Sequence, residues 1–252
     1  MFSRGVLSRL ACSGATLCGL PHFPLTYGQT LVVQIPTDGS QAAVFSEALH
    51  LAQHTRVQSV RMLVAQGAAP EASMLQDWPQ TRTPVVQSMG EEDELAVLRS
   101  TVRTYNTGLV LRPPLRPSWL DLFKRAPHVN LAHNLGCPLF LARNPQAQYK
   151  RIVVTFNGST AGMGGLEVGV DVARQTRLPL AAVVVQESDV IQGAGGKEWL
   201  EETLHALREL AHVHKVAIEE IVGEGNPVRE TLAAVRATDM VIIGCERSQK
   251  GL

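Results

Sequence analysis

The sequence predicts an α/β protein made of two tandem parallel sheets, each covered by helices. Short apolar segments of strand length alternate with longer amphipathic segments of helical period along most of the 252 residues. The chain also repeats itself, because one apolar strand pattern runs into TDGS at 37–40 and another runs into FNGS at 156–159. An amphipathic helix pattern follows each turn, and the offset of about 120 residues predicts two domains of ordinary size.

The first domain is expected over residues 29–146. Its first helix places Val44, Phe45, Ala48 and Ala52 on one stripe, and Ser40 is available as the N-cap. A later helix opens with four consecutive acidic residues, which complement the positive end of the helix dipole. The strands are predicted at 31–36, 60–65, 84–87, 108–111 and 138–142, and the helices at 40–54, 91–105 and 118–134.

The second domain is expected over residues 147–252 and repeats the same order. Its first helix buries a stripe that includes Leu166 and Val170, and Asn226 and Pro227 supply the N-cap and first position of a later helix that ends near 237. The strands are predicted at 152–155, 180–185, 216–222 and 240–243. The pattern after Gly244 holds no counterpart of the last helix and strand of the first domain, so we expect this sheet to lack them.

Residues 1–28 form a leader that contains no acidic residue and carries Arg4 and Arg9 among small and apolar residues. The favoured interpretation is an ordinary, poorly ordered leader, and the alternative is a peptide that targets the protein to an organelle. A third hypothesis is that residues 5–20 form a short helix and strand that complete the second sheet by a permuted route.

Composition excludes several classes of function. The chain has 23 basic and 23 acidic residues, mixed along its length, which disfavours a nucleic-acid or membrane partner. No segment reaches the roughly 20 apolar residues that span a bilayer, so we expect a soluble, cytoplasmic protein. The four cysteines, at 12, 18, 137 and 245, lack the spacing of a zinc site or a redox pair. His50 and His54 have no convincing third ligand, so we expect no metal.

Several motifs in matching order resemble the universal stress protein family in its tandem, two-domain form. They are the strand into TDGS, its repeat VVTFNGS, and the segments GEGNPVRETLAA, DMVIIG and GCPLFLAR. The resemblance covers about residues 29–252, with the second domain truncated. It implies an open Rossmann-type sheet of five parallel strands in the order 3-2-1-4-5 in each domain, like that of adenine-nucleotide hydrolases. It also implies tandem pairing or a homodimer, and binding of ATP or AMP in some members.

In the nucleotide-binding members an acidic residue after the first strand contacts the nucleoside. A glycine-rich loop after the fourth strand wraps the phosphates with backbone amides. The first domain keeps the acid as Asp38, but its loop reads RPPLRP at 112–117, where three prolines stiffen the chain and remove amide donors. We interpret Arg112 and Arg116 as part of a solvated, rigid loop, and a side-chain contact with an anion is the alternative.

In the second domain Gly244 stands at the first glycine of that loop, Arg247 replaces the second glycine, and Asn157 replaces the acid. Half of the candidate nucleotide site is therefore present in each domain. The favoured interpretation is that both turns serve only the fold, with the glycines making the bend and the serines capping helices. The candidate residues are Asp38, Gly39, Ser40, Asn157, Gly158, Ser159 and Gly244.

The sequence contains no nucleophile elbow, Walker loop or HExxH motif, so we expect no catalytic residue. The predicted function is that of a non-enzymatic regulatory binding protein of the stress response, with weak or lost binding of ATP or AMP and an unknown regulatory protein partner. One alternative is a slow ATPase or another adenine-nucleotide hydrolase. Another is a regulatory domain detached from a transporter or kinase.

Overall fold

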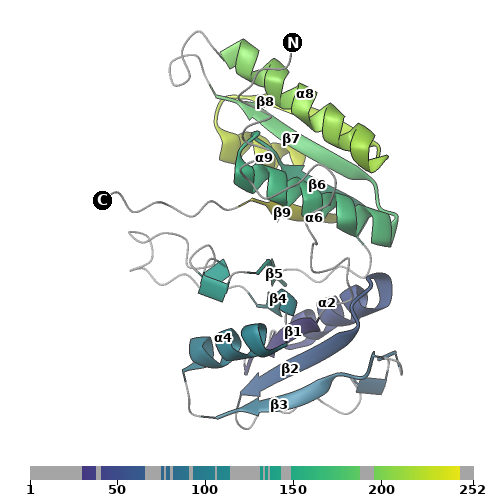
Figure 1. Cartoon of the computed structure of the whole chain (residues 1–252), viewed down its shortest axis with the longest axis vertical. Coiled ribbons are helices and arrows are strands. Elements are labelled where there is room, and N and C mark those ends of the chain that lie inside the picture. The colour runs from purple at the N-terminus through teal and green to yellow at the C-terminus, as the bar shows by residue number, and fades with distance from the viewer. Residues whose placement is uncertain are drawn as a thin grey trace. The chain divides into compact units, whose positions relative to one another are not determined.

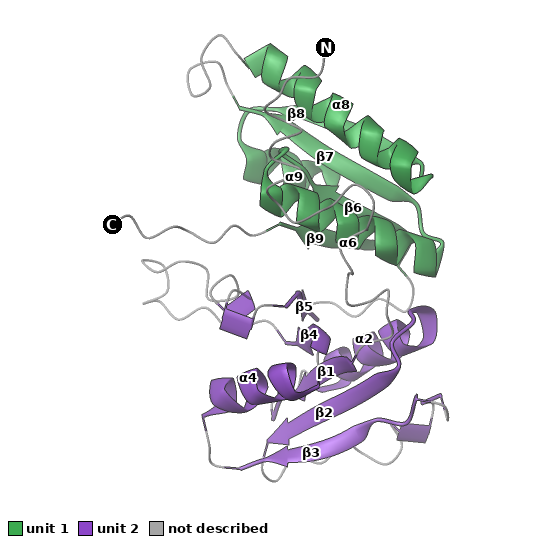
Figure 2. Cartoon of the chain, viewed as in Figure 1, with its two compact units in different colours: residues 1–23, 148–252 green, residues 24–147 purple. Residues whose placement is uncertain are grey.

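The computed structural model forms two compact units, one containing residues 30–142 and the other residues 149–244 (Figure 2). The described residues are 30–37, 41–65, 75–76, 78–79, 82–90, 93–105, 107–113, 131–132, 134–135, 137–142, 149–187 and 196–244. The leader 1–28, the turn 38–40, Arg116 and the segment 245–252 lie outside them, so the predictions made for these residues stay predictions.

The first unit contains a parallel five-stranded sheet in the order β3-β2-β1-β4-β5 (Figure 1). This is the predicted 3-2-1-4-5 order. The central strand is buried at every position, as expected for a strand that has a neighbour on both sides and helices over its faces. The strands are β1 (Thr30–Ile35), β2 (Ser59–Ala65), β3 (Val85–Met89), β4 (Thr107–Arg112) and β5 (Leu139–Leu141).

Two regular helices cover this sheet in the described part of the unit: α2 (Gln41–His54) and α4 (Glu94–Thr104). The acidic run predicted a helix from 91, but α4 begins at Glu94 because the Asp93 side chain caps it and accepts the amide of Leu95 at 3.1 Å. The stripe of α4 packs on one face of the sheet. The buried members of that core are Val32, Leu63, Met89, Val97, Leu98, Val102, Val110, Leu131 and Leu135.

The described part of the second unit contains a parallel four-stranded sheet in the order β8-β7-β6-β9, which is the same order without a fifth strand (Figure 1). The predicted boundaries were wrong for two elements: the third strand starts and ends two residues later, and the last helix ends at Ala234 because Val235 is already extended. The strands are β6 (Arg151–Thr155), β7 (Leu180–Gln186), β8 (Ile218–Glu224) and β9 (Asp239–Ile243). The helices are α6 (Thr160–Thr176), α8 (Gly196–His214) and α9 (Pro227–Ala234).

Helix α6 lies unusually close to the sheet, and glycines on its buried face allow this. A Cβ atom at Gly169 would stand 2.4 Å from Cγ2 of Val154 in β6. By contrast, a Cβ atom at Gly164, on another side of the same helix, would meet nothing within 4 Å. The close approach therefore depends on particular glycines.

A buried ion pair joins the start of β6 to the start of β9. Arg151 and Asp239 are register partners, and the Arg151 guanidinium donates to both carboxylate oxygens, at 3.4 and 2.7 Å. The same guanidinium also donates to Glu219 at 3.2 Å and to the Ala234 carbonyl at 3.0 Å. The pair thus connects β6, β8, β9 and the end of α9.

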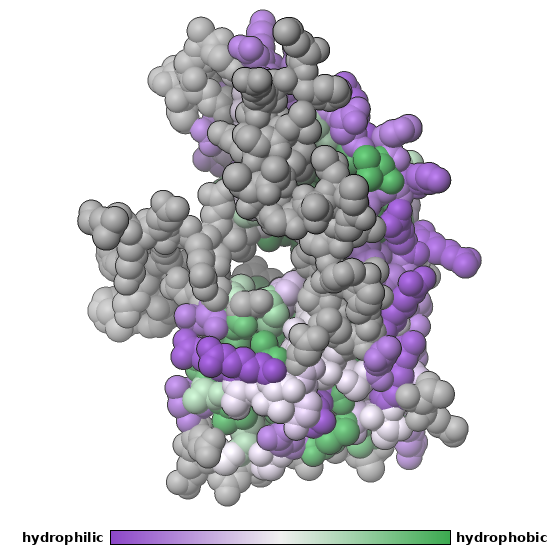
Figure 3. Space-filling view, viewed as in Figure 1, coloured by the Kyte–Doolittle hydropathy of each residue, from purple (hydrophilic) through white to green (hydrophobic). Residues whose placement is uncertain are grey.

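Hydrophilic and hydrophobic side chains are interspersed on the face visible in Figure 3. None of the described helices has the length and apolar character needed to cross a membrane.

Candidate functional site

Each sheet brings its first and fourth strands together as neighbours: β1 pairs with β4, and β6 pairs with β9. The direction of the strand order changes at this pair in each sheet. In open parallel sheets this switch point is where ligands bind. The candidate site of each unit therefore lies at the carboxyl ends of these strands.

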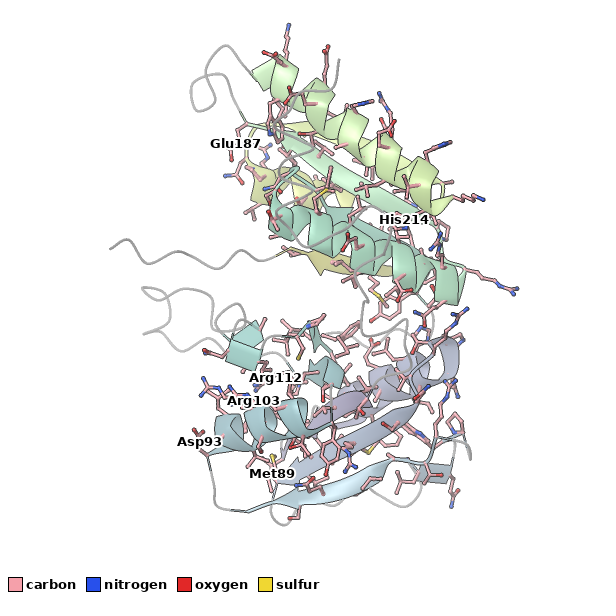
Figure 4. All side chains as sticks on the ribbon, viewed as in Figure 1. Met89, Asp93, Arg103, Arg112, Glu187 and His214 are labelled. Atoms are coloured by element: carbon pink, nitrogen blue, oxygen red, sulfur yellow. The ribbon has the colours of Figure 1, made fainter. Side chains whose placement is uncertain are left out.

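In the first unit the switch point carries three polar side chains. Val33 pairs with Leu111, so the residues that follow them, Gln34 and Arg112, lie on adjacent strands near the ends of β1 and β4. Side chains two residues apart in a strand point to the same face of the sheet. Gln34 therefore shares the face of Val32, and Arg112 shares the face of Val110, which is the face covered by α4. Glu94, the first residue of α4, completes the group, and Figure 4 shows Arg112 beside this helix.

Glu94 contacts both of the other side chains in this group. Arg112 is 6 % exposed, and its Nη2 lies 3.5 Å from Oε1 of Glu94, whose side chain is 52 % exposed. Gln34 is also 6 % exposed, and its amide nitrogen donates to the same Glu94 oxygen. Its Oε1 is buried and has no hydrogen-bond partner among the described residues. Burial lowers the pKa of Arg112, and the charge of Glu94 acts in the opposite direction.

The interpretation of Arg112 as a solvated loop residue was wrong. Arg112 is the last residue of β4, where it pairs with Leu141 of β5. The prolines that follow it made the segment look like a loop, but the alternation of TGLVLR continues to Arg112. Extending that alternation by one residue would have placed this side chain on a buried face. Asp38, Gly39 and Ser40, predicted for the same end of the sheet, lie outside the described residues.

In the second unit the predicted turn residues come together at the start of α6. The Oδ1 atom of Asn157 accepts hydrogen bonds from the backbone amide and the hydroxyl of Ser159, at 3.1 and 2.7 Å. Ser159 caps the helix, since its Oγ accepts the amide of Gly162 at 3.1 Å. Gly158 has φ of +71°, which favours glycine. Here the predicted bend and cap are observed.

Gly244, predicted for the same site, lies against the first turn of α6. A Cβ atom there would stand 2.1 Å from the carbonyl oxygen of Ala161 and 2.8 Å from the amide nitrogen of Gly162. The end of β9 and the start of α6 are therefore in direct backbone contact. The sequence placed Gly244 at this edge, but only the distance between helix and strand shows that a side chain cannot fit.

No group of three His, Cys, Asp or Glu side chains suited to a metal ion occurs within the described ranges. His50 and His54 stack, with ring centroids 4.4 Å apart, and Nδ1 of His54 lies 3.0 Å from the His50 carbonyl oxygen. Burial, followed by the charge of His54, lowers the pKa of His50. The two rings therefore contact each other on α2.

Comparison with known proteins gives a likeness in structure only. No protein-family model matches the sequence, and no curated protein matches it. The chain is similar to the crystal structure of a universal stress protein from Archaeoglobus fulgidus DSM 4304, with a TM-score of 0.58 and 10 % identity over 82 % of this chain and 83 % of that one. It is also similar to a functionally unknown protein from Pseudomonas aeruginosa PAO1, with a TM-score of 0.62 and 12 % identity over 86 % of this chain and 82 % of that one. The sheet order, read with these likenesses, shows that the chain has the fold of the universal stress proteins.

Proposed function

We propose that this protein is a regulatory binding protein of the universal stress type, without catalytic activity, that binds ATP or AMP weakly. The observation that carries the proposal is the switch point of the second sheet, where the glycine turn and the capped start of α6 lie against the end of β9. A helix N-terminus at the switch point of an open parallel sheet suits a phosphate-bearing ligand.

The internal contacts of this turn support low affinity. Asn157 Oδ1 is already used by both donors of Ser159, and the Gly162 amide is used by the Ser159 hydroxyl. A nucleotide would have to compete with these hydrogen bonds. Asparagine also lacks the negative charge of an acid, so it forms weaker hydrogen bonds with the hydroxyl groups of a ribose.

The test is a calorimetric titration of the full chain with ATP and AMP, after any nucleotide released by denaturation has been identified. We expect a Kd of roughly 1 mM, which corresponds to about 4 kcal/mol. Asn157→Asp should tighten binding, because a carboxylate is a stronger acceptor. The matched control is Asn226→Asp, since Asn226 also caps a helix of this unit, by accepting the amides of Val228 and Arg229. The absence of heat from both the native chain and Asn157→Asp would refute nucleotide binding.

The absence of catalysis is part of the proposal. Incubation with ATP should give no sustained release of phosphate above the buffer. Phosphate release by an activity that co-purifies with the chain would favour the alternative of a slow ATPase.

The proposal includes self-association and a regulatory protein partner, in the cytoplasm. Sedimentation velocity over a range of concentrations tests the homodimer, and a monomer at every concentration would refute it. Affinity capture under stress tests for the partner, with an unstressed sample as the control. Imaging of the chain fused at its C-terminus to a fluorescent protein distinguishes a cytoplasmic location from an organelle.

A further inference from the structure

Within the described residues, the charge of Arg112 has fewer partners than that of Arg151, the buried arginine that begins β6. Arg151 is 7 % exposed and contacts two carboxylates, with oxygens at 2.7, 3.2 and 3.4 Å, and one carbonyl at 3.0 Å. Arg112 is 6 % exposed, yet Glu94 at 3.5 Å is its one carboxylate partner in the described part of the chain. Its Nε–H donates to the Pro113 carbonyl at 3.3 Å. A buried charge with so few partners is costly.

The neighbouring Gln34 has a side-chain oxygen that lacks a hydrogen-bond donor within the described residues. Its Oε1 atom is buried and accepts no hydrogen bond from any residue that the structure describes, although its nitrogen donates to Glu94. A buried carbonyl oxygen without a donor costs about 1–3 kcal/mol. The end of the sheet thus offers an arginine that needs an anion, next to an amide oxygen that needs a donor.

We propose that Gln34 and Arg112 form a binding site for free hydrogen phosphate at the carboxyl ends of β1 and β4. The anion's unprotonated oxygens accept from the guanidinium of Arg112, and its one P–OH group donates to Oε1 of Gln34. Glu94 is the exposed member of the group, so its side chain is the one that moves aside when the anion enters.

The need for a donor separates hydrogen phosphate from related anions. Sulfate has the same shape and charge but carries no hydrogen at neutral pH. A phosphate monoester loses its second proton at a pKa of about 6, so at pH 7.5 it has no hydroxyl to offer. Hydrogen phosphate retains its P–OH at this pH. The inference goes beyond the proposed function, because it requires no nucleoside and lies in the other unit.

The test is calorimetric titration of the full chain with inorganic phosphate and with sulfate, at pH 7.5 in a buffer without either anion. We expect phosphate to bind about tenfold more tightly than sulfate, since a hydrogen bond to a buried group contributes roughly this factor. Gln34→Leu should remove most of this preference. AMP at the same pH should compete no better than sulfate.

Charge variants separate a binding site from a merely structural ion pair. Arg112→Met should abolish phosphate binding, and Glu94→Gln should tighten it severalfold, because it removes the carboxylate that competes for the guanidinium. Arg103→Met is the matched control, since it removes an exposed arginine of α4 and should leave binding unchanged. A structural pair would lower stability in both variants, without opposite effects on affinity.

Several results would overturn the inference. They are equal affinity for phosphate and sulfate, phosphate binding that persists in Arg112→Met, weaker binding in Glu94→Gln, and no phosphate binding to the native chain at millimolar concentration. If Arg112→Met does not fold, the direction of the change in Glu94→Gln decides. Because the probe contains no nucleoside, failure of ATP and AMP to bind leaves this test intact.

Discussion

Two alanine substitutions in one helix test how closely α6 lies to its sheet. At Gly169, a new Cβ would stand 2.4 Å from Cγ2 of Val154 and 3.3 Å from Cδ1 of Leu180. Favourable carbon contacts lie near 3.5–4.0 Å, so the first of these distances is a severe overlap. Val154 is fully buried, and its branched side chain has little freedom to rotate away. Gly164 has no such neighbour within 4 Å.

The expected free energies follow from these distances. Replacing a glycine inside a helix by alanine contributes about 1 kcal/mol to stability. Overpacking a core costs about 1–3 kcal/mol. Gly164→Ala should therefore raise the free energy of unfolding by about 1 kcal/mol. Gly169→Ala should leave it unchanged or lower it by up to about 2 kcal/mol, so the two variants should differ by about 1–3 kcal/mol.

Hydrogen exchange of the β6 amides measures this difference in the second unit alone, because these amides lie in the middle of its sheet. The exchange of β1 amides in the same samples serves as the internal control. If Gly169→Ala protects β6 as much as Gly164→Ala does, α6 is farther from the sheet than described, and the reasoning is refuted.

Three further predictions concern ionisable groups. Burial acts to raise the pKa of Asp239, but the hydrogen bonds and charges of Arg151 and Arg236 outweigh it and hold the pKa below its usual value. The pair should therefore stabilise the second unit above the unfolded pKa of about 3.9, and this stability should be lost as pH falls through the folded value. Asp239→Asn should abolish that acid dependence in urea titrations between pH 2 and 6. Burial raises the pKa of Glu167 to about 7, so the folded state favours the neutral acid and stability should fall as pH rises from about 4.5 to 7. Glu167→Gln should raise the free energy of unfolding at pH 8 but not at pH 4, and equal changes at both values would contradict this. Burial raises the pKa of the Cys137 thiol to about 11, so its alkylation at pH 8, followed by peptide mass mapping, should be roughly a hundredfold slower than in urea.

Much of the fold could be predicted from local pattern. The alternation of apolar strands and amphipathic helices located the elements within a few residues, because a strand buried on both faces must be apolar throughout. The caps at Ser159 and Asn226 were also predicted, since side-chain oxygens before a helix satisfy its free amides. The strand order came from the resemblance to a family, because periodicity alone does not say which strands are neighbours.

The polar interior of the sheets could not be predicted in the same way. Arg112 was assigned to a loop because of the prolines after it, although the strand alternation continues to this residue. Arg151 and Asp239 each begin a strand, and their opposite charges become meaningful once β6 and β9 are known to be in register. The contact of Gly244 with α6 depends on a distance between helix and strand that no local pattern contains.

The pairing of Arg151 with Asp239 has a consequence for how the second unit folds. The two residues are separated by 88 positions, and β6 has its two neighbours in strands from the middle and the end of the unit. A fragment that stops before β9 would contain Arg151 without its closest carboxylate and β6 without one of its two ladders. We therefore expect that this unit does not fold without β9. Progressive shortening from the C-terminus should show a sharp loss of structure at the step that removes Asp239.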